Sequence, residues 1–280
     1  MEKEIILENL EKFGVFQTHV SLLKSENIFD FYKKNKSFLE KVICEDEVVN
    51  RKELLRRGMP IRDRTKFYEF QSKQLIGEGL SLDNSPIINF YLQDLFLDVA
   101  EGYLETDEVR MRNCIAFYHP KNPFPPTNSQ NWHRDTEDRK ILKIFVHYND
   151  VSLNNGALSY VKNSKFGSKN DNIWSNLKDD DYKHGYLSLN AISKIPSEDV
   201  VTVEGKAGTI CFFDANGFHK GGQVRSGERI STHCCYLRND APHIKNQILP
   251  TFDYNRDINF LNKESENYLN LSERQKKLLQ

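Results

Sequence analysis

Hydrophobic residues recur at two different spacings along the 280-residue chain. Up to about residue 105 the spacing is that of amphipathic helices: Ile6, Leu10 and Phe13 lie three or four positions apart, and Phe31 and Phe38 belong to a second such segment. From about residue 109, apolar and polar residues alternate instead, as they do in half-buried strands. The pattern therefore predicts a helical N-terminal region followed by a region of short strands.

A third apolar segment, PIINFYLQDLFLDVAEGYL, ends the helical region. Its apolar residues are so dense that they would occupy every side of a helix, which predicts that the segment is buried between other elements. Gly102 lies near its end. Because glycine adopts the left-handed conformation at little cost, we expect it to cap the C-terminus of this helix.

The alternating region contains several short strands. VRMRNCIAFYH runs up to Pro120. The next strand, KILKIFVHYNDV, is expected to carry Leu142, Ile144, Val146 and Tyr148 on one face and Lys143, Phe145, His147 and Asn149 on the other. Asn155-Gly156 marks a tight turn, and VVTVEG, GTICFFD and RISTHCCYL supply further strands. Many short strands beside helices predict a mainly β fold with flanking α-helices, the double-stranded β-helix (a jelly-roll or cupin-type barrel).

The sequence predicts a single domain over residues 1–280. We expect a mostly helical N-terminal support at 1–108, the double-stranded β-helix core at 109–240 and a C-terminal extension at 241–280, in which FLNKESENYLNLSERQKKLL is helical. Residues 162–198 are polar and irregular. They are predicted to form an insertion near one mouth of the barrel, where long loops often act as lids or binding loops.

Charge and cysteine content narrow the function classes. The 39 basic and 40 acidic residues are well mixed and give a net charge of −1, which does not fit a nucleic-acid-binding surface. No apolar run approaches the roughly 18 residues of a membrane span, and MEKEIILENLEKF lacks the apolar core of a signal peptide. We therefore expect a cytoplasmic protein without membrane or nucleic-acid partners. The five cysteines form no C-x-x-C pair, and Cys234 and Cys235 are expected on opposite faces of a strand.

Two histidines and an aspartate are the strongest candidates for chemistry. His133 and Asp135 lie in SQNWHRDTEDRK, after a proline-rich loop, and His219 follows a strand in TICFFDANGFHKGG. In an extended segment, residues i and i+2 point to the same side, so His133 and Asp135 can both reach into a barrel. Two imidazoles and one carboxylate form the facial triad that binds Fe(II) and leaves positions open. Chance alone gives about half of one H-x-D in a chain of this composition, so the strand and turn context carries the prediction.

Arg229, ten residues after His219, begins the strand RISTHCCYL. Inside a barrel, its guanidinium group could bind a substrate or cofactor carboxylate through two parallel hydrogen bonds. The alternative for this arginine is a surface ion pair with Glu228 or Glu204.

Together these segments resemble the phytanoyl-CoA dioxygenase-like family of Fe(II)/2-oxoglutarate oxygenases. The resemblance rests on QNWHRDTEDRKILKIFVHYNDV, NNGALSYVKNSKFG and GTICFFDANGFHKGGQVRSGER, and it covers residues 110–238. Asn163 stands where glycine is commoner in the family, and Lys165 stands where histidine is usual. ENLEKFGVF resembles, more loosely, the opening helix and glycine of the family.

The resemblance implies a role for each candidate. His133, Asp135 and His219 would bind iron. Arg229 would hold the distal carboxylate of 2-oxoglutarate, with Arg225 as the alternative if the strand register differs. The implied reaction hydroxylates a small molecule with dioxygen and releases succinate and carbon dioxide. The carboxylate at position 135 favours hydroxylation over halogenation, because related halogenases have a small residue there.

Two alternative roles are open for each of three further residues. Gln130 would contact iron-bound groups or bond within its loop. Lys143 and His147 would line the pocket, or lie in solvent if their face is the outer one. For the whole chain, the alternatives to a 2-oxoglutarate-dependent hydroxylase are a non-catalytic cupin-like binding protein and a zinc or manganese enzyme, such as an isomerase or hydrolase, on the same barrel.

Overall fold

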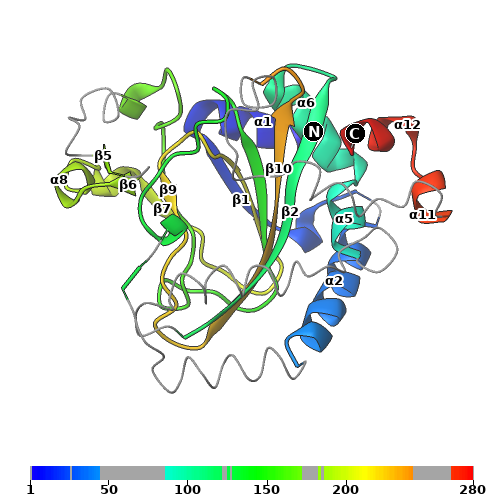
Figure 1. The fold of residues 1–280 in the computed structure, drawn as a ribbon, viewed down its shortest axis with the longest axis horizontal. Coiled ribbons are helices and arrows are strands. Elements are labelled where there is room, and N and C mark those ends of the chain that lie inside the picture. Colours follow the sequence, from blue (N-terminus) through cyan, green and yellow to red (C-terminus); the bar gives the residue numbers. More distant parts are fainter. Residues whose placement is uncertain are drawn as a thin grey trace.

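Two antiparallel sheets pack against each other in the computed structural model of the protein (Figure 1). The larger sheet consists, in spatial order, of β1 (Val15–His19), β8 (Thr209–Asp214), β3 (Leu142–His147), β10 (Glu228–Arg238) and β2 (Val109–Pro120). The smaller consists of β7 (Val200–Thr202), β4 (Ser159–Val161) and β9 (His219–Lys220). The structure describes residues 2–25, 27–44, 86–121, 125–126, 128–171, 182–183, 186–241 and 266–279. The predicted double-stranded β-helix with flanking helices is confirmed.

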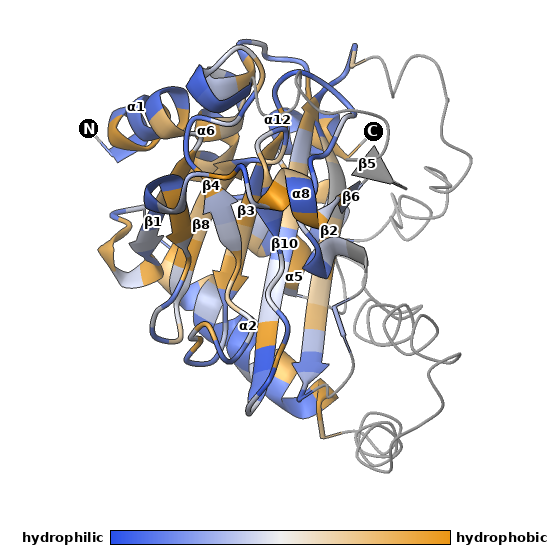
Figure 2. Cartoon of the chain, turned by 90° about the vertical axis from the view of Figure 1, so that its left-hand side faces the viewer, coloured by the Kyte–Doolittle hydropathy of each residue, from blue (hydrophilic) through white to orange (hydrophobic). Residues whose placement is uncertain are grey.

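Helices cover the face of the larger sheet that points away from the smaller sheet (Figure 1). They are α1 (Glu2–Phe13), α2 (Ile28–Val42), α5 (Pro86–Tyr91) and α6 (Asp94–Leu104). From β3, Leu142, Ile144 and Val146 enter this helix-facing core, as the alternation predicted. In α1, Leu10 is fully buried whereas Ile5 is 47% exposed, so only one stripe of the helix faces the core (Figure 2).

The third apolar segment differs from its prediction at Gly102. The segment forms two helices, α5 and α6, and Gly102 lies inside the second of them. The prediction of a glycine cap is therefore wrong: Glu105 takes the left-handed conformation, with a φ of 57°, that ends α6. Glycine at position 102 lets α6 approach α1 closely: a Cβ there would lie 2.8 Å from Cδ1 of Leu7, which would have to move.

The N-terminal region also supplies a strand that the helical spacing did not predict. Strand β1 pairs antiparallel with β8, with Val15 opposite Phe213. Gly14, which joins α1 to β1, has a φ of 79°, and a Cβ there would lie 2.3 Å from the hydroxyl of Tyr160. Glycine alone satisfies both the left-handed backbone and the close approach.

The inner face of the larger sheet lines the space between the two sheets. Phe145 and Phe213 pack there against Tyr160 of the smaller sheet. Cys235 belongs to this inner cluster and Cys234 to the helix-facing one, as predicted for adjacent strand residues. The alternation therefore fixes which side chains of β3 and β10 point into the barrel.

Shorter elements complete the described chain. They are η1 (Val20–Leu22), η3 (Asn128–Gln130), η4 (Lys169–Asp171), β5 (Tyr182–Lys183), β6 (Tyr186–Leu187), α8 (Leu189–Ile192), η6 (Ser197–Asp199), α11 (Glu266–Leu269) and α12 (Glu273–Leu278). Part of the predicted insertion, at 172–181 and 184–185, and the extension before Glu266, at 242–265, lie outside the described residues. The helical character expected near the C-terminus is confirmed for α11 and α12. Within the described ranges, every helix is too short or too polar to cross a membrane.

A buried carboxylate holds the end of β8 in place. Asp214 is fully buried, and its Oδ2 accepts a hydrogen bond from the hydroxyl of Tyr103 at 2.5 Å. Its Oδ1 accepts from the backbone N–H groups of Ile141 at 3.1 Å and Asn216 at 2.9 Å. Asp214 therefore connects α6, the entry to β3 and the turn that leads to His219.

Replacing Tyr103 with Phe tests this connection. We expect Tyr103→Phe to lower the free energy of unfolding by about 1–3 kcal/mol, because a buried acceptor loses its donor. Denaturant titration followed by circular dichroism measures the change. Tyr118→Phe is the matched control, since its hydroxyl bonds Glu228 at 2.8 Å and this carboxylate is only half-buried, so that water can replace the donor. Equal losses in both variants would contradict a special role for the Tyr103–Asp214 bond.

Candidate metal centre

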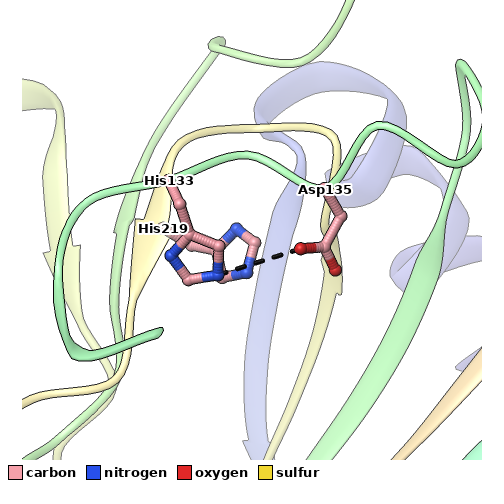
Figure 3. A group of neighbouring side chains, drawn as sticks. All are labelled: His133, Asp135 and His219. Atoms are coloured by element: carbon pink, nitrogen blue, oxygen red, sulfur yellow. Dashed lines mark ion pairs between the residues drawn. The ribbon is translucent and has the colours of Figure 1, made fainter. Parts of the chain in front are cut away.

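The three metal-ligand candidates come together because two segments pair through their backbones. His133 precedes β3, and His219 begins β9. The N–H of His133 donates to the carbonyl of His219 at 3.0 Å, and the N–H of His219 donates back at 2.9 Å. The N–H of Asp135 donates to the carbonyl of Ala215 at 2.9 Å. The paired segments direct the side chains of His133, Asp135 and His219 toward one another (Figure 3).

The atoms of this triad are arranged as metal ligands require. One ligand atom from each residue lies within 4.8 Å of the other two, and Nε2 of His133 is 3.8 Å from Oδ1 of Asp135. Nδ1 of His133 contacts the carbonyl of Asn131 at 2.8 Å, and Nδ1 of His219 contacts that of Gly217 at 2.9 Å. A carbonyl only accepts, so each Nδ1 carries the proton and each Nε2 keeps its lone pair. The donor set therefore fits a divalent iron ion.

The electrostatics of the site favour the metal-binding forms of all three residues. Burial lowers the pKa of both His133 and His219, which keeps the imidazoles neutral. Burial alone would raise the pKa of Asp135, but the ammonium group of Lys143 outweighs it and holds that pKa below its usual range. Lys143 donates a short hydrogen bond from Nζ to Oδ2 of the aspartate. Oδ1, the other oxygen, faces the histidines.

The turn before His219 is tied to the loop that carries Asp135. The side-chain Nδ2 of Asn216 donates to the carbonyl of Asp135 at 3.3 Å. Gly217 follows, and a Cβ there would lie 2.0 Å from the hydroxyl of Tyr160, so the tight approach of this turn to β4 requires glycine. The sequence DANGFH thus sets the position of His219 through packing as well as pairing.

Arg229 lies inside the barrel beside the strand of His219. It is 3% exposed, and its Nη1 donates to the carbonyl of Gly156. A Cβ at Gly221, two residues after His219, would lie 3.7 Å from Nη2 of Arg229. Burial excludes the surface ion pair considered above. Arg225, the alternative, is exposed in the turn before β10.

The inner faces of β2, β3 and β10 form a wall that continues from the triad to Arg229. This wall comprises Phe117, His119, Lys143, Phe145, His147, Arg229, Ser231 and His233. Sequence reasoning placed Lys143 and His147 on one face, and that face is the inner one. It missed His119, Ser231 and His233, which the alternation along β2 and β10 could have revealed once Arg229 was placed inside. Gln130, at the end of η3, is 5% exposed, and its contact with iron-bound groups stays a prediction.

One aromatic residue of the insertion reaches the triad. Tyr186 forms an isolated β-bridge with His133, and the two rings meet edge to face with centroids 5.8 Å apart. No sequence signal distinguished this tyrosine, because its segment has no periodic pattern. Its position shows that part of the predicted insertion lies beside the metal candidates.

Comparison with known proteins identifies the class. A sequence model described as phytanoyl-CoA dioxygenase (PhyH) matches residues 45–231, and the chain belongs to this family. The family consists of Fe(II)- and 2-oxoglutarate-dependent oxygenases, so the cofactors of this protein are Fe(II) and 2-oxoglutarate. No curated protein matches the sequence.

Several solved structures share the fold. AviO1 from Streptomyces viridochromogenes Tue57 is 17% identical, with a TM-score of 0.52 over 86% of this chain and 96% of that one. SnoN, a non-heme alpha ketoglutarate dependent epimerase from nogalamycin biosynthesis, is 15% identical, with a TM-score of 0.51 over 85% and 83%. EctD from S. alaskensis with bound Fe is 16% identical, with a TM-score of 0.51 over 84% and 76%. At these identities the likeness concerns the fold.

The buried histidines of the wall make stability depend on pH. Burial and the neighbouring Arg229 lower the pKa of His147 from 6.5 to about 3. Between these values the unfolded chain binds a proton at this position that the folded protein does not, so stability falls as pH falls. His147→Asn is therefore expected to reduce the slope of unfolding free energy against pH in this window by about 1.4 kcal/mol per pH unit.

Urea titrations at several pH values between 4 and 6.5 measure that slope. A titration at pH 8, where His147 is neutral in both states, gives the cost of the substitution itself. An unchanged slope in the His147→Asn variant would mean that this histidine takes up its proton in the folded state as well.

Proposed function

We propose that the protein hydroxylates a small molecule, with Fe(II) bound by His133, Asp135 and His219 and 2-oxoglutarate anchored by Arg229. The observation that carries the proposal is the triad, whose ligand atoms lie within 4.8 Å of one another. When bound, Fe(II) and 2-oxoglutarate supply the activation of dioxygen: 2-oxoglutarate loses carbon dioxide and takes one oxygen atom to become succinate, and the other oxygen enters a C–H bond of the substrate.

The protein residues would orient and enclose the reactants. The carbonyls of Asn131 and Gly217 hold the two imidazoles in a single tautomer and ring orientation. Three protein ligands would leave part of the coordination sphere of the iron open for 2-oxoglutarate and dioxygen. Arg229 is charged and buried at the far end of the wall, where its planar guanidinium group suits the distal carboxylate.

Hydroxylation is the outcome we favour among those that this fold supports. One solved structure of EctD holds 2-oxoglutarate and 5-hydroxyectoine, whereas SnoN is an epimerase, so similar barrels serve more than one reaction. Asp135 provides the third protein ligand, whose absence would free a position for halide. For the substrate we favour a polar small molecule over a long acyl chain, because Lys143 and His233 are half-buried, polar members of the inner wall.

Replacing the metal-binding aspartate tests the chemistry. Purified protein with Fe(II) and 2-oxoglutarate is expected to form succinate slowly without substrate. Asp135→Ala should abolish hydroxylation in a substrate screen and weaken metal binding by more than the roughly 10- to 100-fold typical of outer-sphere partners, because a direct ligand is lost. Circular dichroism checks that the fold is kept, and Asp150→Ala, at an exposed aspartate, is the control. Retained hydroxylation by Asp135→Ala would show that the ligand is misassigned.

Arg229→Lys separates anchoring of 2-oxoglutarate from metal binding. The lysine keeps the positive charge but loses the planar pair of donors, so we expect the KM for 2-oxoglutarate to rise about tenfold or more. Metal affinity, measured by calorimetry with Mn(II), should stay within experimental error, since Arg229 is not a ligand. An unchanged KM for 2-oxoglutarate would exclude Arg229 as its anchor.

A further inference from the structure

We propose that Lys143 is a positioning residue that binds Oδ2 of Asp135, so that this aspartate gives the metal only one oxygen. The inference rests on the proposed function, because it assumes that Asp135 is a metal ligand. It adds to the triad a lysine from the neighbouring strand. By this reading, Lys143 protects the coordination positions that 2-oxoglutarate and dioxygen need.

The geometry singles out Lys143 as the group that orients the carboxylate. The backbone of Asp135 is already held by the carbonyl of Ala215 and the side chain of Asn216. What remains free to rotate is the carboxylate itself. Nζ of Lys143 bonds Oδ2, and Oδ1 is left toward His133 at 3.8 Å from its Nε2.

The lysine is itself held in place by the sheet. Lys143 lies on the inner face of β3, the central strand of the larger sheet, opposite Phe213 on β8 and Cys235 on β10. The side chains of Lys143 and Asp135 are each only 16% exposed. A buried ion pair with a backbone anchored on both sides has little freedom to rearrange, so the orientation of the carboxylate is set before metal binds.

The positive charge of Lys143 indicates that its contact with Asp135 serves to orient the carboxylate rather than to strengthen metal binding. An ammonium group beside a metal site repels a divalent cation and weakens its binding. A carboxylate can also bind a metal through both oxygens, which would use a position that the reaction needs. A lysine on the outer oxygen therefore makes metal binding weaker but keeps the open face open.

Three variants test the proposal. Lys143→Met removes the charge and the hydrogen bond at similar length, and Lys143→Arg keeps a cationic donor. Lys220→Met is the electrostatic control: Lys220 lies next to His219, but its Nζ sits over the ring of Trp132 at 4.9 Å rather than on Asp135. Each protein is loaded anaerobically with Fe(II), or with Co(II), whose visible absorption reports coordination number.

We expect Lys143→Met to bind Co(II) at least as tightly as the unaltered protein, with a changed absorption spectrum. Its affinity for 2-oxoglutarate in the presence of metal should fall about 10- to 100-fold, by analogy with the losses of metal affinity or activity that follow removal of partners that orient metal ligands. The charge-transfer band of the Fe(II)–2-oxoglutarate complex should weaken in parallel. Lys143→Arg should restore most of the affinity, and Lys220→Met should leave the Co(II) spectrum unchanged.

Some outcomes of these measurements would overturn the proposal. The proposal is overturned if Lys143→Met and Lys220→Met give the same spectrum and the same affinity for 2-oxoglutarate. In that case Lys143 binds Asp135 only in metal-free protein, where it takes the place of the metal cation. If Lys143→Met does not fold, Lys143→Gln, which keeps a neutral N–H donor, is measured in the same way. Failure of the unaltered protein to bind metal would instead contradict the proposed function.

Discussion

The structure of the site depends on one backbone interaction, the pair of reciprocal hydrogen bonds between His133 and His219. These residues are far apart in the sequence and belong to a loop and a short strand, which meet through this pair of bonds. Because the two bonds set the register of both segments, the imidazoles converge, and Asp135 follows on the same side. The turn before His219 stabilises this pairing through the hydrogen bonds of Asn216 and Asp214 and the close packing at Gly217.

The polar side chains of the inner wall are arranged by charge. Cations lie at both ends of the inner wall, Lys143 beside the triad and Arg229 beyond it, and neutral histidines lie between them. Burial keeps these imidazoles uncharged, so the wall attracts anions without placing several further positive charges together. Such a surface agrees with the proposed binding of dianionic 2-oxoglutarate between the metal candidates and Arg229.

Much of this arrangement follows from short-range sequence rules. Strict alternation in β3 placed Lys143 and His147 on one face, which only the structure identifies as the inner one. The H-x-D spacing placed His133 and Asp135 on one side of the chain. Gly102 was misread because glycine has two uses, a left-handed cap and close packing, and only the contact with α1 distinguishes them. The positive φ of 57° at Asn163 explains why glycine is commoner there, yet nothing local predicted Tyr186 beside His133. Contacts between distant segments were the part that spacing could not supply.

The position of β1 has a consequence for how the protein forms during synthesis. Val15 is synthesised well before its partner Phe213, because the two residues lie far apart in the sequence. Until the residues of β8 have been synthesised, the backbone groups of β1 lack the strand with which they pair in the folded protein. Long waits of this kind slow folding and expose strand edges to other chains. The strand at the edge of the larger sheet therefore pairs late, after the residues of β8 have been made.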